Sequence, residues 1–339
     1  MENTPLTGTP PLKIGSLTIW PPVLSAPMAG FTNFAYRQFL RELGGVGLIA
    51  TEMVSARSFV YLDRAGQDHP DRLWGIENEP QPLSVQIWDN MPETLAQTAK
   101  RLVDDYHVSV IDLNFGCPAP KIATKSQSGS RLLKDPAKVE SIIRQVVEAC
   151  GQTPVTAKIR LGVSAEFMNA GEVANAVEEA GAAALTVHGR TASQMYTGQA
   201  DWEKIAVIKP YLKKIPLIGN GDIKTVDEAI SRLRDYPVDG IMIGRAGLDR
   251  PWLFRQICDI LEGKTPRPDP SDEELRRLLL RLYSLVSARF GPMSTVILMR
   301  TYACHYFKGK PGARGFRTRV ALATTQEEFI AALDELDKN

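Results

Sequence analysis

The sequence has 339 residues, of which 44% are hydrophobic and 23% are charged, a globular composition that excludes a disordered or fibrous protein. Forty Lys and Arg against 39 Asp and Glu give a net charge of +1, so no overall basic excess indicates a nucleic-acid partner. No apolar run approaches the roughly 20 residues that span a bilayer, and the N-terminus lacks the pattern of a secretory signal. We therefore expect a cytoplasmic protein with no membrane partner.

Short apolar, β-branched runs recur along the chain, and helical patterns lie between them, as at 136–149, 170–180 and 225–233. Such near-continuous hydrophobic runs are typical of strands buried on both faces of a parallel sheet. A doubly wound sheet would normally carry a GxGxxG pattern after its first strand, but here Ala-Pro-Met-Ala-Gly (26–30) stands in that place. The pattern therefore predicts an α/β fold, a (β/α)8 TIM barrel. Its eight strands are expected at 22–26, 46–51, 83–88, 108–114, 155–159, 184–188, 216–219 and 240–244.

The pattern changes at residues 262–270, a polar stretch with three prolines that we interpret as a linker. Helical patterns follow at about 272–288, 292–307 and 324–336, and they predict a C-terminal all-α helical domain over 271–339. Residues 271–319 hold ten Lys and Arg against three acidic residues, so the neutral total hides a basic helical module. The predicted organisation is an N-terminal lead-in (1–11), a barrel domain (12–261), the linker and this helical domain.

In barrel enzymes the reactive groups lie at the carboxyl ends of the strands and in the loops that follow. Gly221 and Gly244 follow the seventh and eighth predicted strands, where barrels commonly bind phosphate because glycine lets backbone N–H groups approach the oxygens. The two glycines could instead only permit tight turns. Their joint occurrence at this pair of loops favours a phosphorylated ligand.

Lys158 lies near the end of the fifth predicted strand, where its side chain would point into the barrel mouth. A lysine is costly to bury there without an anionic partner. It could form a Schiff base, contact a phosphate or stabilise negative charge on a cofactor ring, and the structural alternative is a lysine that snorkels to solvent. His188 closes the sixth strand at the same mouth, and its alternative is a buried core histidine with satisfied hydrogen bonds.

Cys117 lies in a Gly-Cys-Pro loop after the fourth predicted strand. Its thiol could be a nucleophile, a metal ligand or a proton donor. No His or second Cys is close in sequence, so we expect no metal site. The alternative, a small buried hydrophobic residue, is our interpretation of Cys150, Cys258 and Cys304, which lie in helical patterns.

Taken together, these motifs resemble one family, the tRNA-dihydrouridine synthases, and most closely the bacterial B-type subgroup. The resemblance runs from about residue 12 to 335, and the stretch between Lys125 and Gly129 is about one residue longer than the family pattern. The motifs, in chain order, are Ala26-Pro27-Met28-Ala29-Gly30, Asn114-Phe115-Gly116-Cys117-Pro118 with Lys121 and Gly129-Ser130, Lys158-Ile159-Arg160, His188-Gly189-Arg190-Thr191, Asn220-Gly221-Asp222 and Gly244-Arg245.

The resemblance implies that the barrel mouth holds FMN and that NADPH (or NADH) is the reductant. Lys158 would lie at the N1/O2 edge of the flavin, where a cation stabilises the reduced ring. His188 would also face the flavin. The remaining contacts implied are with the ring by Pro27, Met28, Ala29 and Gln86, and with the ribityl and phosphate groups by Asn220, Gly221, Asp222, Gly244 and Arg245.

By the same resemblance, the reaction would be the reduction of a uridine in the D-loop of tRNA to 5,6-dihydrouridine. A hydride would pass from FMN to uracil C6, and Cys117 would give a proton to C5. Asn114 and Arg160 are then expected to contact the uracil. The basic helices, including Arg314 and Arg317, would bind tRNA phosphates and so offset the cost of flipping the nucleotide out of the folded RNA.

Two other functions stay open at this point. One is an FMN barrel oxidoreductase that acts on a free pyrimidine, which leaves the basic helical module unexplained. The other is a non-catalytic RNA-binding barrel, against which the presence of Cys117 and Lys158 argues. We expect the protein to be a monomer.

Overall fold

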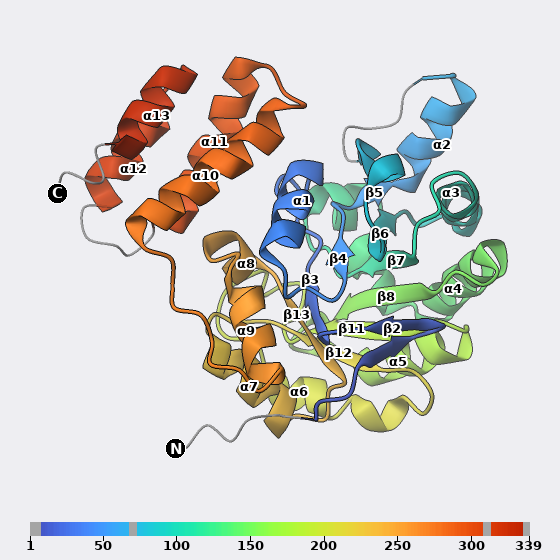
Figure 1. The fold of residues 1–339 in the computed structure, drawn as a ribbon. Coiled ribbons are helices and arrows are strands. Elements are labelled where there is room, and N and C mark those ends of the chain that lie inside the picture. The colour runs from blue at the N-terminus through green and yellow to red at the C-terminus, as the bar shows by residue number, and fades with distance from the viewer. Residues whose placement is uncertain (1–7, 68–72, 308–312, 335–339) are drawn as a thin grey trace.

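The computed structural model describes residues 8–67, 73–307 and 313–334, and its centre is a ring of parallel strands (Figure 1). The strands are β3 (Val23–Ser25), β4 (Ile49–Ala50), β6 (Leu83–Trp88), β7 (Val110–Phe115), β8 (Val155–Arg160), β11 (Ala184–His188), β12 (Leu217–Asn220) and β13 (Gly240–Ile243). They pair in the order β3-β13-β12-β11-β8-β7-β6-β4, and β5 (Val54–Ser55) adds to β6. The ring closes between β3 and β4, where the amide of Gly47 donates to the carbonyl of Val23 (2.8 Å). The predicted (β/α)8 barrel is confirmed.

Helices follow the strands and cover the outside of the barrel (Figure 1). The patterns at 136–149, 170–180 and 225–233 correspond to α4 (Pro136–Cys150), α5 (Ala170–Glu179) and α7 (Val226–Asp235). Helix α7 begins at a capping box in which Thr225 and Glu228 satisfy each other's backbone amides. The outer helices are α1 (Phe34–Leu43), α2 (Ala56–Arg64), α3 (Pro92–Asp104), α4 (Pro136–Cys150), α5 (Ala170–Glu179), α6 (Trp202–Ala206), α7 (Val226–Asp235), α8 (Arg245–Asp249) and α9 (Leu253–Leu261).

A hairpin of β1 (Leu12–Ile14) and β2 (Leu17–Ile19), which the sequence did not predict, closes the end of the barrel where the strands begin. Its strands have three residues each, too few to show an alternating pattern. Ile14 is fully buried and packs in a cluster with residues from the barrel interior, among them Val110, Ala184 and Ile218. This apolar plug leaves the opposite end, where the strands finish, for the functional site.

In the C-terminal part, the residues that the structure describes form four helices: α10 (Asp272–Ser287), α11 (Pro292–Tyr306), α12 (Ala313–Leu322) and α13 (Gln326–Asp334). The helices expected at 272–288 and 292–307 are confirmed, and α13 accounts for the third. Helix α12 was missed because its first half contains a glycine and scattered arginines. Phe316 and Val320, spaced four residues apart, nevertheless bury its inner face.

The predicted linker contains no helix or strand, but it is held against the barrel. Asp269 accepts hydrogen bonds from Arg250 (2.5 Å) and from the indole of Trp252 (3.1 Å), and Gln256 donates to the carbonyl of Arg267 (2.8 Å). The helical part then packs on α1 and α8 (Figure 1), where the Tyr36 and Tyr302 rings are stacked. The domain limits stay predictions, and residues 1–7 of the predicted lead-in lie outside the described residues.

No helix within the described ranges is long and apolar enough to cross a lipid bilayer.

Candidate active site at the barrel mouth

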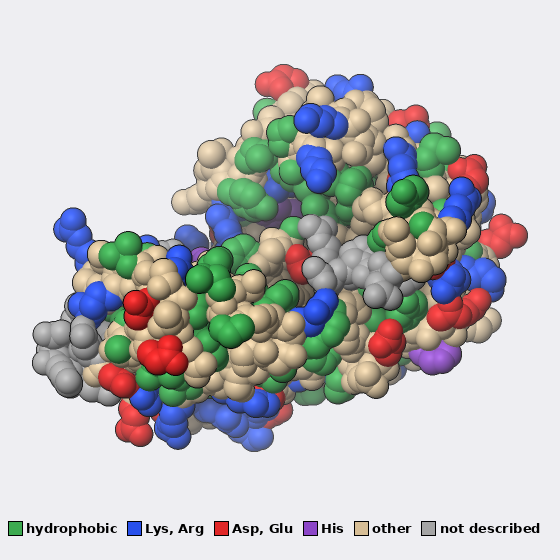
Figure 2. Space-filling view, turned by 90° about the horizontal axis from the view of Figure 1, so that it is seen from above, with side chains coloured by type: hydrophobic (Ala, Val, Ile, Leu, Met, Phe, Trp, Pro, Cys, Tyr) green, Lys and Arg blue, Asp and Glu red, His purple; other side chains and the backbone are tan. Residues whose placement is uncertain are grey.

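Five neighbouring strands bring polar side chains together at the carboxyl end of the barrel. In the sheet register Asn114 lies beside Lys158, and His188 lies between Arg160 and Asn220. Side chains two residues apart on a strand point to the same face. Asp112 and Asn114 on β7 therefore both point into the barrel, and so do Lys158 and Arg160 on β8. Seen from above, the surface is hollowed between the C-terminal helices and the rest of the molecule, and Lys, Arg and His side chains gather there (Figure 2).

Cys117 lies in a loop whose backbone is fixed from two sides. The Oδ1 of Asn114 accepts hydrogen bonds from the amides of Gly116 (3.1 Å) and Cys117 (2.9 Å). The carbonyl of Cys117 accepts one from the amide of Ser130 (3.0 Å). Gly129 makes this approach possible, because it has a φ of 57° and any Cβ there would lie 2.6 Å from the Cys117 carbonyl. The thiol is therefore presented from a fixed turn.

The stretch that follows Cys117 is irregular. Residues Lys121–Lys125 form a π-helical turn, a rare conformation that is frequent at functional sites. Gln127 then adopts a φ of 48°, which non-glycine residues seldom do. The hydrogen bonds around Cys117 are intact, and the extra residue expected between Lys125 and Gly129 stays a prediction.

Burial raises the pKa of the Cys117 thiol, and the smaller opposing effects of Arg160 and Lys158 do not reverse the shift. The group is therefore a protonated thiol at neutral pH. A nucleophilic cysteine needs a lowered pKa, whereas a proton donor must hold its proton when the substrate arrives. Of the roles that the sequence left open, the site favours proton donation. No group of three or more metal-ligating side chains occurs within the described ranges.

Lys158 lies at the mouth, where it is partly buried and its amine is held by a hydrogen bond. Its Nζ donates to the Oδ1 of Asn220 (3.0 Å), and the Nδ2 of Asn220 donates to the carbonyl of Met242 (2.7 Å). Burial, followed by repulsion from Arg160, lowers the pKa of Lys158 to about 8. The hydrogen bond to Asn220 favours a lysine held in the mouth over one that snorkels to solvent, and an anion bound nearby would favour the charged form of this lysine.

Arg160 and Arg190 tie the loops around the mouth together. Arg160 donates through Nε to the carbonyl of Gly116 (2.9 Å) and through Nη1 to that of Thr191 (2.9 Å). Arg190 donates to Asp222 (2.7 Å) and to the carbonyl of Gly198 (2.8 Å). The sequence placed Arg190 in a motif but assigned it no role, because nothing local shows that its partners come from a distant strand end.

His188 is neutral. Burial is the largest cause that lowers its pKa, followed by the charges of Lys158, Arg160, Arg190 and Arg245. Its Nε2 lies 3.3 Å from a guanidinium nitrogen of Arg190, which can only donate, so Nε2 is the acceptor and Nδ1 carries the proton. The same four cations lie on one side of the mouth, where their positive charge would attract an anionic ligand.

The phosphate loops predicted after β12 and β13 lie beside these cations. Gly221 has a φ of 132°, a conformation that favours glycine. The carboxylate of Asp222 accepts hydrogen bonds from Arg190 and from the amide of Ala200 (2.7 Å). Because these bonds occupy the carboxylate, Asp222 would contact a ligand through its backbone. The side chain of Arg245 is half exposed and lies over the ring of Tyr196.

The loop after β3, which carries Pro27, Met28 and Ala29, reaches the same place. A Cβ on Gly244 would lie 3.8 Å from the Sδ of Met28, so this loop borders the phosphate loop. The amide of Gly30 donates to the buried carboxylate of Glu52 (2.5 Å). Sequence reasoning assigned Glu52 no role, and the structure shows that it anchors this loop.

The side-chain amides of Gln86 and Asn114 are hydrogen-bonded to each other. The Nδ2 of Asn114 donates to the Oε1 of Gln86 (2.8 Å), and the Nε2 of Gln86 donates to the carboxylate of Asp112 (2.7 Å). The expected contacts of Gln86 with the flavin and of Asn114 with uracil stay predictions. Asp112 was missed, although a charged residue inside the apolar run 108–114 was a usable signal.

Some arginines of the basic helical part form ion pairs within the protein, and others are exposed on its surface. Arg276 pairs with Asp334, and Arg281 pairs with Glu42 on the barrel. Arg314 and Arg317 are exposed on α12, and neither side chain makes an ion pair with a residue that the structure describes. Lys308 and Lys310 lie outside the described residues.

Comparison with known proteins decides the family. The family described as Dihydrouridine synthase (Dus) matches residues 24–339. The chain belongs to the dihydrouridine synthase family. It is 38% identical to the tRNA-dihydrouridine synthase B of Pseudomonas putida over 319 residues, which cover 94% of this chain and 92% of that protein. A probable tRNA-dihydrouridine synthase of Mycobacterium tuberculosis is 34% identical over 342 residues, which cover 97% and 85% of the two chains.

Solved structures support the fold of this dihydrouridine synthase family member. Morphinone reductase in complex with tetrahydroNAD is 15% identical with a TM-score of 0.52, and the match covers 79% of this chain and 93% of that chain. The old yellow enzyme from Trypanosoma cruzi is 11% identical with a TM-score of 0.53, and the match covers 78% and 94%. At these identities the likeness concerns the barrel alone.

Proposed function

We propose that this protein reduces a uridine in the D-loop of tRNA to 5,6-dihydrouridine, with FMN bound at the barrel mouth and NADPH or NADH as the reductant. The observation that carries the proposal is Cys117, a protonated thiol on a fixed loop at the mouth of a barrel. Family membership and the names of both tRNA-dihydrouridine synthase relatives support the choice of substrate.

The residues present fit FMN. The phosphate would be held by the backbone of Gly221 and Gly244 and by Arg245, next to the four cations that lower the pKa of His188. Lys158, fixed by Asn220, offers a positive charge to the electron-rich ring. Pro27, Met28, Ala29, Gln86, His188 and the Asn220-Gly221-Asp222 turn complete the cofactor site in this proposal. When bound, FMN supplies the hydride that reduces the pyrimidine.

The chain's own residues supply the proton and the orientation. Cys117 holds a proton on Sγ and delivers it to the C5 carbon of the uracil, so its thiol must be protonated before each turnover. The Asn114 bonds to the amides of Gly116 and Cys117 keep Sγ in one place. Asn114 and Arg160 are the proposed uracil contacts.

A uridine inside folded tRNA has to leave its stack to enter the mouth, at a cost of a few kcal/mol. Arg314 and Arg317 are exposed on α12 and free to meet phosphates, which would offset this cost through salt-dependent contacts. We further propose that the protein acts in the cytoplasm and as a monomer.

The test is mass spectrometry of an unmodified tRNA pool incubated with the protein, FMN and NADPH. A D-loop uridine that gains the mass of two hydrogens supports the proposal, and fragment mapping names its position. If NADPH reduces the bound flavin but no tRNA gains mass, RNA is the wrong substrate and free pyrimidines become the substrates to test. Protein that binds tRNA but no flavin would support a non-catalytic barrel.

A further inference from the structure

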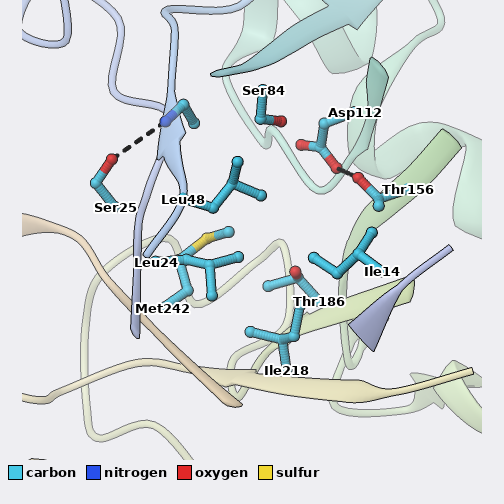
Figure 3. Close-up of a pocket in the computed structure, with 11 residues that line it drawn as sticks. Ile14, Leu24, Ser25, Leu48, Ser84, Asp112, Thr156, Thr186, Ile218 and Met242 are labelled. Atoms are coloured by element: carbon cyan, nitrogen blue, oxygen red, sulfur yellow. Dashed lines mark hydrogen bonds between the residues drawn. The ribbon is translucent and has the colours of Figure 1, made fainter. Parts of the chain in front are cut away.

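Asp112 is a buried carboxylate inside the barrel, one layer below the mouth. It lies on β7 two residues before Asn114, and it is 4% exposed. Figure 3 shows it at one side of a small interior cavity, pointing toward Thr156, with apolar residues such as Leu24 and Ile218 on the other side. A carboxylate is costly in such surroundings, and burial raises the pKa of Asp112 to about 6. Side-chain packing alone does not explain an acid at this position.

Both oxygens of Asp112 accept hydrogen bonds. The hydroxyl of Thr156 donates to Oδ1 (2.7 Å), and the Nε2 of Gln86 donates to Oδ2 (2.7 Å). Gln86 then accepts at Oε1 from the Nδ2 of Asn114 (2.8 Å). Asn114 in turn accepts at Oδ1 from the amide of Cys117 (2.9 Å). A continuous chain of hydrogen bonds therefore runs from the barrel interior to the loop that carries the thiol.

The ends of this chain determine its direction. The backbone amide of Cys117 can only donate, so Asn114 must turn its oxygen toward the loop and its NH2 group toward Gln86. Gln86 must then present its own oxygen to Asn114 and its NH2 group to Asp112. The chain is satisfied only if the group at its inner end accepts, and an ionised carboxylate is acceptor-only. An apolar residue there would leave the Gln86 amide free to rotate and present either end to Asn114.

We propose that Asp112 is a positioning residue whose carboxylate fixes the direction of the Gln86–Asn114 hydrogen bonds and thereby holds the Cys117 loop for proton transfer. The proposal rests on the proposed function for the role of Cys117 as the acid. Asp112 does not touch the thiol. Its effect is transmitted through two side-chain amides whose donor and acceptor ends it orders.

The test compares three variants of the full-length protein. Asp112→Leu removes the acceptor and keeps the same branched side-chain skeleton. Asp112→Asn retains one acceptor oxygen for Gln86, because the Thr156 hydroxyl can accept from the new NH2 group. Ser84→Ala is the matched control, since Ser84 lines the same cavity (Figure 3) and is not part of the chain. Thermal unfolding establishes that each variant is folded.

The primary readout is alkylation of Cys117 by iodoacetamide without substrate, followed by peptide mass spectrometry from pH 7 to 10.5. We expect Asp112→Leu to loosen the loop and move the profile toward lower pH, nearer that of an ordinary thiol, with at least a threefold faster reaction at pH 8. Asp112→Asn should restore most of the wild-type profile, and Ser84→Ala should retain it. A wild-type profile in folded Asp112→Leu overturns the proposal.

A second readout is single-turnover reduction of saturating tRNA, which should fall at least tenfold in Asp112→Leu with the tRNA Kd unchanged. If Asp112→Leu does not fold, Gln86→Met cuts the chain at its next link and should shift the alkylation profile in the same direction. An unshifted profile in that variant also contradicts the proposal. Because alkylation needs neither flavin nor tRNA, it separates this inference from a failure of the proposed reaction.

Discussion

The hydroxyl of Tyr302, on α11, donates a hydrogen bond of 2.7 Å to the carbonyl of Phe31, in the loop that follows the first barrel strand. The Tyr302 ring also stacks on Tyr36, which lies in the first turn of the helix after that loop. The same loop carries Met28, beside the phosphate loop after β13. The C-terminal helices therefore contribute directly to the support of the proposed flavin site, and the two parts share one continuous hydrophobic core.

Tyr302→Phe should remove this hydrogen bond and retain the stacked ring. We expect a loss of about 1 kcal/mol in the free energy of unfolding and a severalfold weaker FMN affinity, because the loop of Met28 loses its support. Denaturant unfolding and flavin titration measure the two effects. Tyr283→Phe is the control, since Tyr283 packs against Phe329 within the helical part. Equal loss of FMN affinity in both variants would contradict the connection.

The fold could be predicted from the sequence because its signals are local. Each barrel strand is a short apolar run. Because reactive groups in barrel enzymes lie at the carboxyl ends of the strands, the sequence alone predicts Cys117, Lys158 and His188 at that end of the barrel. The hairpin at 12–19 and helix α12 could not be predicted, since both depend on tertiary burial of a few side chains such as Ile14 and Phe316.

The connections within the site lie beyond local sequence signals. The strand-end rule identifies Arg190 and Asp222 separately, but only the sheet register brings them to 2.7 Å. Asp112 is similar, because its partners Gln86 and Thr156 are contributed by the strands on either side. Side chains proposed to act directly on a ligand were therefore easier to predict than those that hold them in place.

Cys117→Ala should abolish turnover without loss of binding. The substitution removes the proton donor, and general acids typically contribute 10²–10⁴-fold, so we expect a loss of about that size in single-turnover tRNA reduction. FMN and tRNA affinities should stay within twofold of wild type. Cys304→Ala, in α11, is the matched control and should keep full activity. Undiminished tRNA reduction by Cys117→Ala would falsify the proton-donor role.

FMN affinity should fall as the pH rises above about 8. Burial, with repulsion from Arg160, lowers the pKa of Lys158 to about 8. Above that pH the free protein has a neutral lysine, so binding of an anionic ligand to the charged form requires uptake of a proton and becomes weaker as the pH rises. The expected decline approaches tenfold per pH unit until the lysine is neutral in the complex as well. Flavin fluorescence titrations from pH 7 to 10 measure it. Lys158→Met should bind more weakly and with a flatter profile, and parallel profiles would show that another group titrates.

Reversing the charge of the exposed α12 arginines should weaken tRNA binding alone. For Arg314→Glu with Arg317→Glu we expect at least a tenfold higher tRNA Kd and a shallower dependence on salt concentration, because fewer phosphate contacts release fewer counterions. NADPH oxidation without tRNA should be unchanged. The control, Arg144→Glu with Arg234→Glu, makes the same charge change on exposed barrel helices. If the control weakens binding equally, α12 is not the tRNA surface.

The buried carboxylate of Asp112 should make the fold less stable as the pH rises. Burial raises its pKa from an ordinary value of 3.8 to about 6, so between these values the folded state holds a proton that the unfolded chain has released. Stability from this group is therefore present below pH 4 and lost as the pH rises through 6, by about 3 kcal/mol for a shift of this size. Asp112→Asn cannot titrate. Its free energy of unfolding relative to wild type should consequently increase between pH 4 and pH 7, as measured by urea denaturation. A difference that is independent of pH over this range would show that Asp112 is ionised at little cost, in a more polar interior than its apolar neighbours provide.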